Sequence, residues 1–432
     1  MEQTHVVTCF LRNRGEVLLL RRSAEVGSYS GLWGAVSGHA EGDPDAAARE
    51  EIAAETGLLD ACTLARTGVT FEFEDPDLDT RWVVHPYLFD CERRDADTDW
   101  ETAESEWVSP TELLRRETVP QLWTSYSRVA PTIREIAEDV EHGSAYLSVR
   151  ALEVLRDRAG SFVVRAPPRG ADGERRSRER ASDNWTALSV LAEKLLEARP
   201  SMAVVGNRVN RAMATAADDR TPAAVERATS EEIDRAFRAD ERAAENAAEE
   251  IRDDTVLTLS RSGTVLDALD AADRVFVAES RPAREGVAVA EALAERLGPA
   301  NVTLHTDAAV AHVLATEAVD AVVVGTDAIL PDGRVVNKTG TRAAALAAAR
   351  EGVPVYAVAA SDKVPTGDEA FLEDGDLDAV YDGEADLQVV NPTFDVTPAD
   401  CVSGVITERG TLDGEGISEV VEELRDLSAW RA

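Results

Sequence analysis

The sequence predicts an α/β protein: a mixed α+β N-terminal region, then a helical segment, then a Rossmann-like parallel sheet. Its 432 residues exceed the roughly 250–300 residues at which a single hydrophobic core stops growing, so more than one domain is expected. From residue 254 onward, valine-rich runs alternate with longer alanine-rich stretches. This pattern is typical of parallel strands covered by helices on both faces. Ligands of such sheets bind at the carboxyl ends of the strands.

The N-terminal region combines β-prone runs with one helix. The first two runs flank Asn13-Arg14-Gly15, which predicts a hairpin. A glycine-rich stretch, 27–43, leads into the helix, which Pro44 opens. The expected strands are 5–11, 16–20, 69–74 and 81–89, and the expected helix is 44–59.

Helical periodicity dominates residues 132–250 and is interrupted by RAPPRGADGERRSRERASDN (165–184). The Pro, Gly and Arg content of that interruption predicts a mobile loop, either a solvated linker or a lid over an anionic ligand. We therefore expect three parts, 1–130, 133–250 and 251–432. In the last part six runs are expected to be strands: TVLTLS, RVFVAES, VTLHT, AVVVGT, PVYAVAA and AVYDG.

The composition excludes several classes of protein. With 45 basic and 82 acidic residues the formal charge is −37, which argues against direct binding to nucleic acid or to an anionic membrane. The basic residues are almost all arginine, and this acidic, lysine-poor composition favours a halophilic protein. No leader and no apolar run long enough to span a bilayer are seen, so a cytoplasmic location is expected. The four cysteines are far apart in sequence and predict neither a metal–thiolate site nor a disulfide framework.

Two glutamates mark the N-terminal helix. Glu51 and Glu55 are four residues apart, so their carboxylates lie on one helical face, where they are either solvated or hold a divalent cation such as Mg²⁺. Together with the segments GLWGAVSGHAEGD, AREEIAAETGL and ESEWVSPTEL, they give residues 5–130 a pattern that resembles the Nudix hydrolase family. The resemblance implies Mg²⁺ bound by Glu51 and Glu55 beside Gly38, and hydrolysis of a nucleoside-diphosphate-type linkage. The sequence departs from the family pattern in three ways: Glu50 replaces an arginine, Ala54 replaces a glutamate, and the loop is shorter, so that Gly38 and Asp43 only approximate the first half of the motif.

The segment VVVGTDAILPDGRVVNKTGT (322–341) carries the second group of candidate residues. Asp327 directly follows an apolar strand, and Asn337-Lys338-Thr339-Gly340-Thr341 leads into a helix. Backbone N–H groups, two hydroxyls and an ammonium there predict a phosphate site. A lysine that lies by chance beside a capped helix is the alternative.

Residues 133–428 resemble the family that joins the α, β and δ subunits of translation initiation factor 2B with isomerases of methylthioribose 1-phosphate and ribose 1,5-bisphosphate. The motifs are ARPSMAVVGNRVNRAM, TLSRSGTVLDAL, VAESRPAREG, GTDAI, NKTGT and NPTFDVTPADCVSGVITERG. The resemblance implies a helical subdomain on a Rossmann-like sheet, a dimer or larger homo-oligomer, and a cysteine–aspartate acid/base pair. Asp327 matches the aspartate, and Ser260 stands at the cysteine position. The other implied or candidate ligand contacts are Arg281, Asn337, Lys338, Gly340, Thr341, Ser262, Gly263, Asn207 and Arg208.

Three hypotheses follow for the function. The first is a regulatory or metabolite-sensing protein that binds a phosphorylated sugar or nucleotide and carries a degenerate Nudix module. The second is a bifunctional enzyme, with ribose-1,5-bisphosphate-type isomerase and Nudix nucleotide-pyrophosphate hydrolase activities. The third is a non-catalytic interaction subunit.

Overall fold

The computed structural model describes residues 2–164 and 173–431, and the chain divides into two compact units. Unit 1 comprises Met1–Glu135, Leu152–Leu188 and Asp219–Ile233, and unit 2 comprises Ile136–Ala151, Ser189–Asp218 and Asp234–Ala432. Helices α4 (Ser144–Val164), α5 (Gly173–Ala198) and α7 (Pro222–Glu250) contribute segments to both. Within the described ranges, no helix is long and apolar enough to cross a membrane.

Unit 1 is built on an eight-stranded mixed sheet. Its central pair, β1 (Glu2–Asn13) and β7 (Thr80–Cys91), runs parallel along most of its length. β2 (Glu16–Arg22) folds back on β1 through Arg14 and Gly15, whose φ angles of 50° and 78° suit the two-residue hairpin expected there. The remaining strands are β3 (Trp33–Gly34), β4 (Val36–His39), β5 (Cys62–Thr67), β6 (Phe71–Asp75) and β8 (Thr102–Val108).

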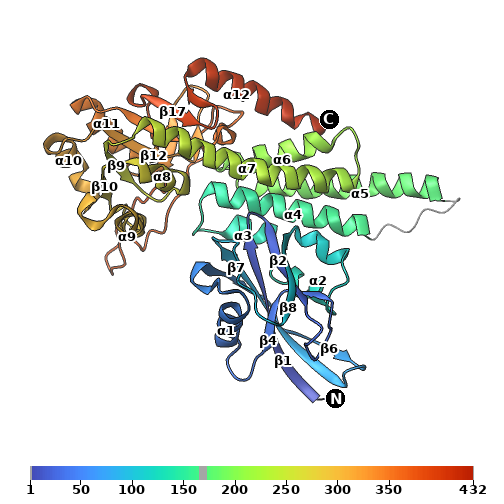
Figure 1. The fold of residues 1–432 in the computed structure, drawn as a ribbon. Helices are drawn as coiled ribbons and strands as arrows, with labels where there is room; N and C mark the ends of the chain where they lie inside the picture. Colours follow the sequence, from blue (N-terminus) through green and yellow to red (C-terminus); the bar gives the residue numbers. More distant parts are fainter. Residues whose placement is uncertain (1, 165–172, 432) are drawn as a thin grey trace. The chain divides into compact units, whose positions relative to one another are not determined.

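One helix covers each face of this sheet (Figure 1). Helix α1 (Pro44–Thr56) is capped by Asp43, begins with Pro44 and ends at Gly57, where φ is 64°. Its Ile52 packs on the face that carries Cys9, while α2 (Leu122–Ser127) packs on the opposite face. Alternate residues of β1 thus reach the two cores, as the period of a strand requires.

Unit 2 contains a seven-stranded sheet in the order β11-β10-β9-β12-β15-β17-β18. All neighbours are parallel except β18, so the chain order of the parallel strands is 3-2-1-4-5-6. The order reverses between β9 and β12, where doubly wound sheets bind ligands. The strands are β9 (Thr255–Leu259), β10 (Arg274–Ala278), β11 (Val302–His305), β12 (Ala321–Gly325), β15 (Val355–Val358), β17 (Gly404–Thr407) and β18 (Gly410–Leu412).

Helices cover both faces of this second sheet, as expected (Figure 1). Val256 packs with Leu293 of α9 (Glu285–Leu297) on one face, and Leu257 packs with Ala344 of α11 (Thr341–Glu351) on the other. The helices of this unit outside α4, α5 and α7 are α6 (Ala203–Ala216), α8 (Gly263–Ala268), α9 (Glu285–Leu297), α10 (Val310–Thr316), α11 (Thr341–Glu351) and α12 (Gly414–Asp426). The short α3 (Ile133–Glu138) precedes them, and a small antiparallel sheet joins β13 (Ala328–Ile329), β14 (Val335–Lys338) and β16 (Phe394–Thr397).

Two expectations of local structure are wrong. The run AVYDG (379–383) forms no strand; Val380 is exposed, and the sixth parallel strand is β17. Of the loop expected at 165–184, residues 165–172 lie outside the described residues, but 173–184 belong to α5. The Arg and Glu residues of that stretch are good helix formers, and their helix propensity explains why residues 173–184 are helical.

Candidate functional site

The carboxyl ends of β9 and β12 bring together two loops of unit 2. These strands are neighbours in register, with Leu257 opposite Val322. A side chain at Gly325 would place its Cβ 2.8 Å from the Cβ of Ser262, so the absence of one allows the loop after β9 to approach the end of β12. Ser260 and Asp327 follow these two strands, at the edge of the sheet where the strand order reverses.

Asp327 lies in a polar environment supplied by distant segments. Its Oδ1 accepts a hydrogen bond from Ser144 Oγ at 3.2 Å. Burial raises the pKa of Asp327, although the charges of Lys363 and Lys338 and the bond from Ser144 oppose the shift. Lys363 donates to the carbonyl of Thr326 at 2.6 Å, and burial lowers the pKa of its ammonium. A carboxyl and an ammonium shifted toward neutrality are characteristic of acid/base sites.

Ser260 belongs to a chain of polar contacts that the sequence did not reveal. Its Oγ donates to Oε2 of Glu285 at 2.8 Å. The other oxygen of Glu285 lies 3.1 Å from Nζ of Lys338. We call this arrangement the Ser260–Glu285–Lys338 chain. Glu285 and Lys363 could have been suspected only from their positions after β10 and β15, because neither forms part of a recognisable motif.

The beginning of α11 differs from the phosphate site expected there. The backbone N–H groups of Gly340 and Arg342 donate to the carboxylate of Asp395, at 2.8 and 3.1 Å, and that of Thr339 donates to the carbonyl of Thr393. The expectation that these amides are open to an anion is therefore wrong, because Asp395 on the paired strand β16 already supplies the negative charge.

The side chains of the same turn bond to one another. Asn337 is buried and donates to Oγ1 of Thr341 at 2.9 Å, and Thr341 donates to the carbonyl of Lys338 at 2.7 Å. Of the segment 337–341, Lys338 is left as the residue whose side chain faces Asp327 and Glu285.

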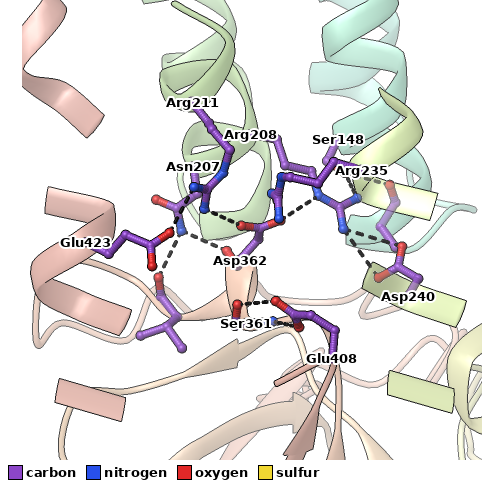
Figure 2. Close-up of polar contacts among 12 residues, drawn as sticks. Ser148, Asn207, Arg208, Arg211, Arg235, Asp240, Ser361, Asp362, Glu408 and Glu423 are labelled. Carbon is purple, nitrogen blue, oxygen red and sulfur yellow. Dashed lines mark hydrogen bonds and ion pairs between the residues drawn. The ribbon is translucent and has the colours of Figure 1, made fainter. Parts of the chain in front are cut away.

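Asn207 and Arg208 belong to an internal network, shown in Figure 2, and not to a ligand surface. Asn207 donates to the carbonyls of Asp362 and Val364, at 2.7 and 2.9 Å. Arg208 is fully buried and bonds Asp362, Ser148 and Asp240. The expected ligand role of this pair is corrected accordingly, since reaching a ligand would require breaking these bonds.

Asp362 is the centre of that network (Figure 2). Its carboxylate, which is fully buried, accepts from Arg208, Arg211 and Arg235. Burial alone would raise the pKa of Asp362, but the three guanidinium groups outweigh burial and hold it well below its ordinary value. The helices α6 and α7 are thereby fixed to the segment that carries Lys363.

Three expected residues lie at the edge of the site. Arg281 is exposed, and its backbone N–H donates to Asp307 at 2.7 Å. Ser262 accepts from the N–H of Val265 at 3.4 Å and so caps α8, which Gly263 opens. Their contact with a ligand stays a prediction.

Unit 1 contains a cavity of about 560 Å³ beside α1. Four carboxylates line it, those of Glu51, Glu55, Asp99 and Glu101. Its lining also includes five aromatic side chains, those of Tyr29, Phe71, Phe73, Trp82 and Trp100. An apolar cleft with a few convergent charged groups has the general form of a small-molecule site.

The carboxylates of this cavity crowd one another. Burial is the first cause that raises the pKa of Glu55, to about 8, and Glu51, Asp99 and Glu101 add to it against a bond from the N–H of Ser37. Burial and Glu101 also raise the pKa of Glu51. A Cβ at Gly38 would lie 1.8 Å from Oε1 of Glu51, so only glycine permits this close approach of the backbone.

These residues fit a hard cation by chemistry. Within the described part of the chain, no three acidic, imidazole or thiol side chains are grouped as a metal site. Mg²⁺, however, commonly uses one or two carboxylates and takes its other ligands from water and substrate phosphate. Glu51 and Glu55 supply the two carboxylates that Mg²⁺ needs. A cation between them would neutralise their mutual repulsion, and this favours binding of the cation.

Comparison with known families assigns both halves of the chain. The initiation factor 2 subunit family matches residues 141–414, and the NUDIX domain matches residues 1–129. The chain belongs to the initiation factor 2 subunit family. Its N-terminal part is a NUDIX domain, and the resemblances inferred from the motifs are confirmed.

Individual relatives include sugar-phosphate isomerases. The chain is 31% identical over 320 residues to a ribose 1,5-bisphosphate isomerase from Haloferax volcanii, which covers 69% of this chain and 94% of the relative. It is 35% identical over 176 residues to a methylthioribose-1-phosphate isomerase from Azotobacter vinelandii, covering 37% of this chain and 49% of the relative. The chain thus spans about half the length of the methylthioribose-1-phosphate isomerases that it matches.

A solved structure shares the fold of the larger half. The translation initiation factor eIF-2B of Pyrococcus horikoshii OT3 has a TM-score of 0.53 and 26% identity, and the match covers 65% of this chain and 94% of that one.

Proposed function

We propose that unit 2 binds a sugar phosphate and isomerises it from aldose to ketose. The observation that carries this proposal is Asp327, a carboxyl with a raised pKa at the reversal point of the sheet, within the field of two lysines. Isomerisation must remove a proton from one carbon and supply one to its neighbour, so it needs groups that exchange protons near neutral pH. The relative from Haloferax volcanii, named for ribose 1,5-bisphosphate, supports a phosphorylated pentose as the substrate class.

The residues around Asp327 have separate tasks in this proposal. Asp327 exchanges protons with the oxygens of the sugar. Lys338 and Arg281 contribute positive charge toward phosphate. Lys363 and Ser144 hold Asp327 in place and limit how far its pKa rises. A homo-oligomer stays a prediction for this family member.

The test is conversion of ribose 1,5-bisphosphate by the full-length protein. Asp327→Asn should lower kcat by at least about 100-fold, the usual scale for loss of an acid/base group, with a small change in KM. Asp332→Asn is the matched control, because Asp332 is exposed in the same hairpin and pairs only locally with Arg334. Binding without turnover, in the wild type, would instead favour a metabolite-sensing protein.

For unit 1 we propose hydrolysis of a nucleoside-diphosphate-type linkage. The observation that favours it is the cavity whose lining combines four carboxylates with aromatic side chains suited to a base. Glu51 and Glu55 would hold Mg²⁺ beside Gly38, where it would supply polarisation of a phosphate oxygen. The aromatic side chains Trp82 and Phe73 position the base.

The hydrolase is tested with a panel of nucleotides in the presence of Mg²⁺. Glu55→Gln should abolish release of phosphate or mononucleotide. Glu50→Gln is the matched control, since Glu50 is exposed on the same helix and does not line the cavity. Equal activity of the two variants would contradict the proposal and leave unit 1 as a binding module.

A further inference from the structure

We propose that Ser260 and Glu285 together form the second acid/base group of the sugar-phosphate site, with the serine hydroxyl relaying a proton between the sugar and the glutamate carboxylate. This inference rests on the proposed isomerase function. It assigns a catalytic role to Ser260 and a proton-accepting role to Glu285.

The geometry of Ser260 supports a relay. Its hydroxyl donates to Glu285 Oε2 at 2.8 Å, the distance of a well-formed O–H···O⁻ bond. Its φ of 66° lies in the left-handed region, which is uncommon for serine, and its N–H is held by Ser280 Oγ at 2.6 Å. Backbone held in such a conformation is found preferentially where a side chain has a task.

Glu285 is fixed as firmly as Ser260. It is the first residue of α9, and the next residue, Gly286, lies against the end of β10. A Cβ at Gly286 would be 1.9 Å from the carbonyl oxygen of Ala278, so the helix begins in direct contact with the strand. This close packing holds the carboxylate toward the loop after β9.

The chemistry requires a base that serine alone does not provide. A hydroxyl is a weak proton acceptor at neutral pH unless an adjacent base takes its proton. In the proposed step the C2–H bond of the sugar breaks and its electron pair forms the C1=C2 bond. The proton passes to Ser260 Oγ while the hydroxyl proton moves to Glu285 Oε2.

The remaining protons are balanced by Asp327. Asp327 supplies a proton to the ring oxygen when the C1–O bond of the ring opens, and it recovers one from the C2 hydroxyl as the ketone forms. The Ser260–Glu285 pair then returns its proton to C1. No oxidant or reductant is consumed, and every group ends in its starting state.

Lys338 connects this pair to the phosphate. In the structure its ammonium lies 3.1 Å from Glu285 Oε1. A substrate phosphate competes for the same ammonium, and a carboxylate that loses a cationic neighbour accepts a proton more readily. Binding of the phosphate therefore prepares Glu285 to take the proton of Ser260.

The experiment measures conversion of ribose 1,5-bisphosphate by full-length variants. Glu285→Gln keeps an oxygen that can accept from Ser260 but cannot take its proton, so kcat should fall by about 100-fold or more while KM changes little. Ser260→Cys introduced into the Glu285→Gln variant should restore turnover, because a thiol ionises without a strong base. Glu279→Gln, in the same loop but paired with Arg284, is the control expected to stay within about two-fold of wild type.

The outcomes separate this inference from the function on which it rests. If the Glu285→Gln variant keeps the kcat of the wild type, the relay is overturned and the isomerase function remains. The same holds if Ser260→Cys does not restore turnover to the Glu285→Gln variant. A wild type without turnover that gains activity through Ser260→Cys alone also overturns it. No turnover in the wild type or in any variant, with unfolding temperatures that all match, removes the proposed function and the relay with it.

Discussion

Glu55 shows how a single carboxylate in the cavity of unit 1 makes stability depend on pH. Its folded pKa of about 8 lies above the ordinary 4.5, so the folded state holds a proton that the unfolded state has lost. This contribution to stability is complete below about pH 4.5 and disappears as the pH rises through 8. Without metal, the free energy of unfolding should therefore fall by roughly 2–4 kcal/mol between pH 5 and 8.

Glu55→Gln should remove most of that slope, measured by urea unfolding at several pH values. The exposed Glu50→Gln variant should keep it. Mg²⁺ competes with the proton for the same carboxylate, so it should raise the unfolding temperature more at pH 8 than at pH 6. An unchanged slope in Glu55→Gln would show that the carboxyl titrates normally.

Asp362 differs from Glu55, because its negative charge contributes to the stability of the folded protein. Three arginines bond this fully buried carboxylate, and Asp362→Asn would remove the negative charge that their guanidinium groups share. Removing one partner of a buried ion pair costs about 3–5 kcal/mol. We expect a loss of that size in chemical unfolding, and a far smaller one for Glu423→Gln, which is partly exposed and bonds Arg211 at the edge of the network. Comparable losses in the two variants would contradict a central role for Asp362.

At the scale of the elements, two cysteines that are distant in sequence meet across neighbouring strands. Cys62 on β5 pairs in register with Cys91 on β7, and their sulfurs are 3.0 Å apart. A hydrogen bond from Cys62 lowers the pKa of Cys91, which favours thiolate chemistry there. Diamide should therefore oxidise the pair to a disulfide, taking up the two electrons and two protons that the thiols lose.

Mass spectrometry under non-reducing conditions should detect this cross-link between the peptides that contain the two residues. The Cys62→Ser variant serves as the control, and Cys9, which is buried against α1, should stay reduced. Because the cross-link closes the loop between Cys62 and Cys91 in the unfolded chain, it should also raise the unfolding temperature of unit 1. A wild type that forms no such cross-link would refute the prediction.

The elements themselves were largely predictable, whereas their long-range contacts were not. The position of β1 follows from its alternating apolar residues, and the position of α1 from Pro44 at its beginning and Gly57 at its end. Both signals lie within the segment itself. Asp327 and Ser260 could be placed because parallel strands end at one edge of a sheet. Ser144, by contrast, bonds Asp327 across 183 positions of sequence. Asp395 occupies the place of the expected anion at the beginning of α11 because β16 pairs with β14. That strand pairing joins distant segments and cannot be predicted from a local sequence pattern.

At the scale of the whole molecule, the charge of −37 predicts a strong response to salt. Like charges destabilise a compact chain, and the screening length falls from about 10 Å at 0.1 M to about 3 Å at 1 M ionic strength. The unfolding temperature should thus rise between 0.1 and about 2 M KCl. Sucrose at equal osmolality, which screens no charge, should give a smaller rise. An unfolding temperature that is indifferent to KCl would count against the halophilic interpretation of the composition.

Unit 1 is made of three separate segments of the chain, and this leads to a prediction about how a shorter fragment would behave. Sequence alone suggested a boundary near residue 130, but unit 1 also includes Leu152–Leu188 and Asp219–Ile233. Buried contacts explain this. Arg12, which is 3% exposed, bonds Glu153 at 3.2 Å, and the fully buried hydroxyl of Tyr126 donates to Asp157 at 2.8 Å. In addition, Nη2 of Arg115 donates to both carboxylate oxygens of Glu226, at 2.8 and 2.7 Å.

A fragment of residues 1–130 removes all of these partners at once. The guanidinium of Arg12 then keeps its bonds to Asp90 but loses Glu153, and the hydroxyl of Tyr126 loses Asp157. Each buried polar group that loses its partner costs about 1–3 kcal/mol. We expect the fragment to unfold well below the temperature at which unit 1 unfolds in the full chain, and to bind hydrophobic dyes. A fragment extended to residue 233 keeps the partners and should regain most of the stability. If the short fragment matched the full chain in calorimetry, the helical segments would be dispensable, and the NUDIX domain would fold independently of the rest of the polypeptide.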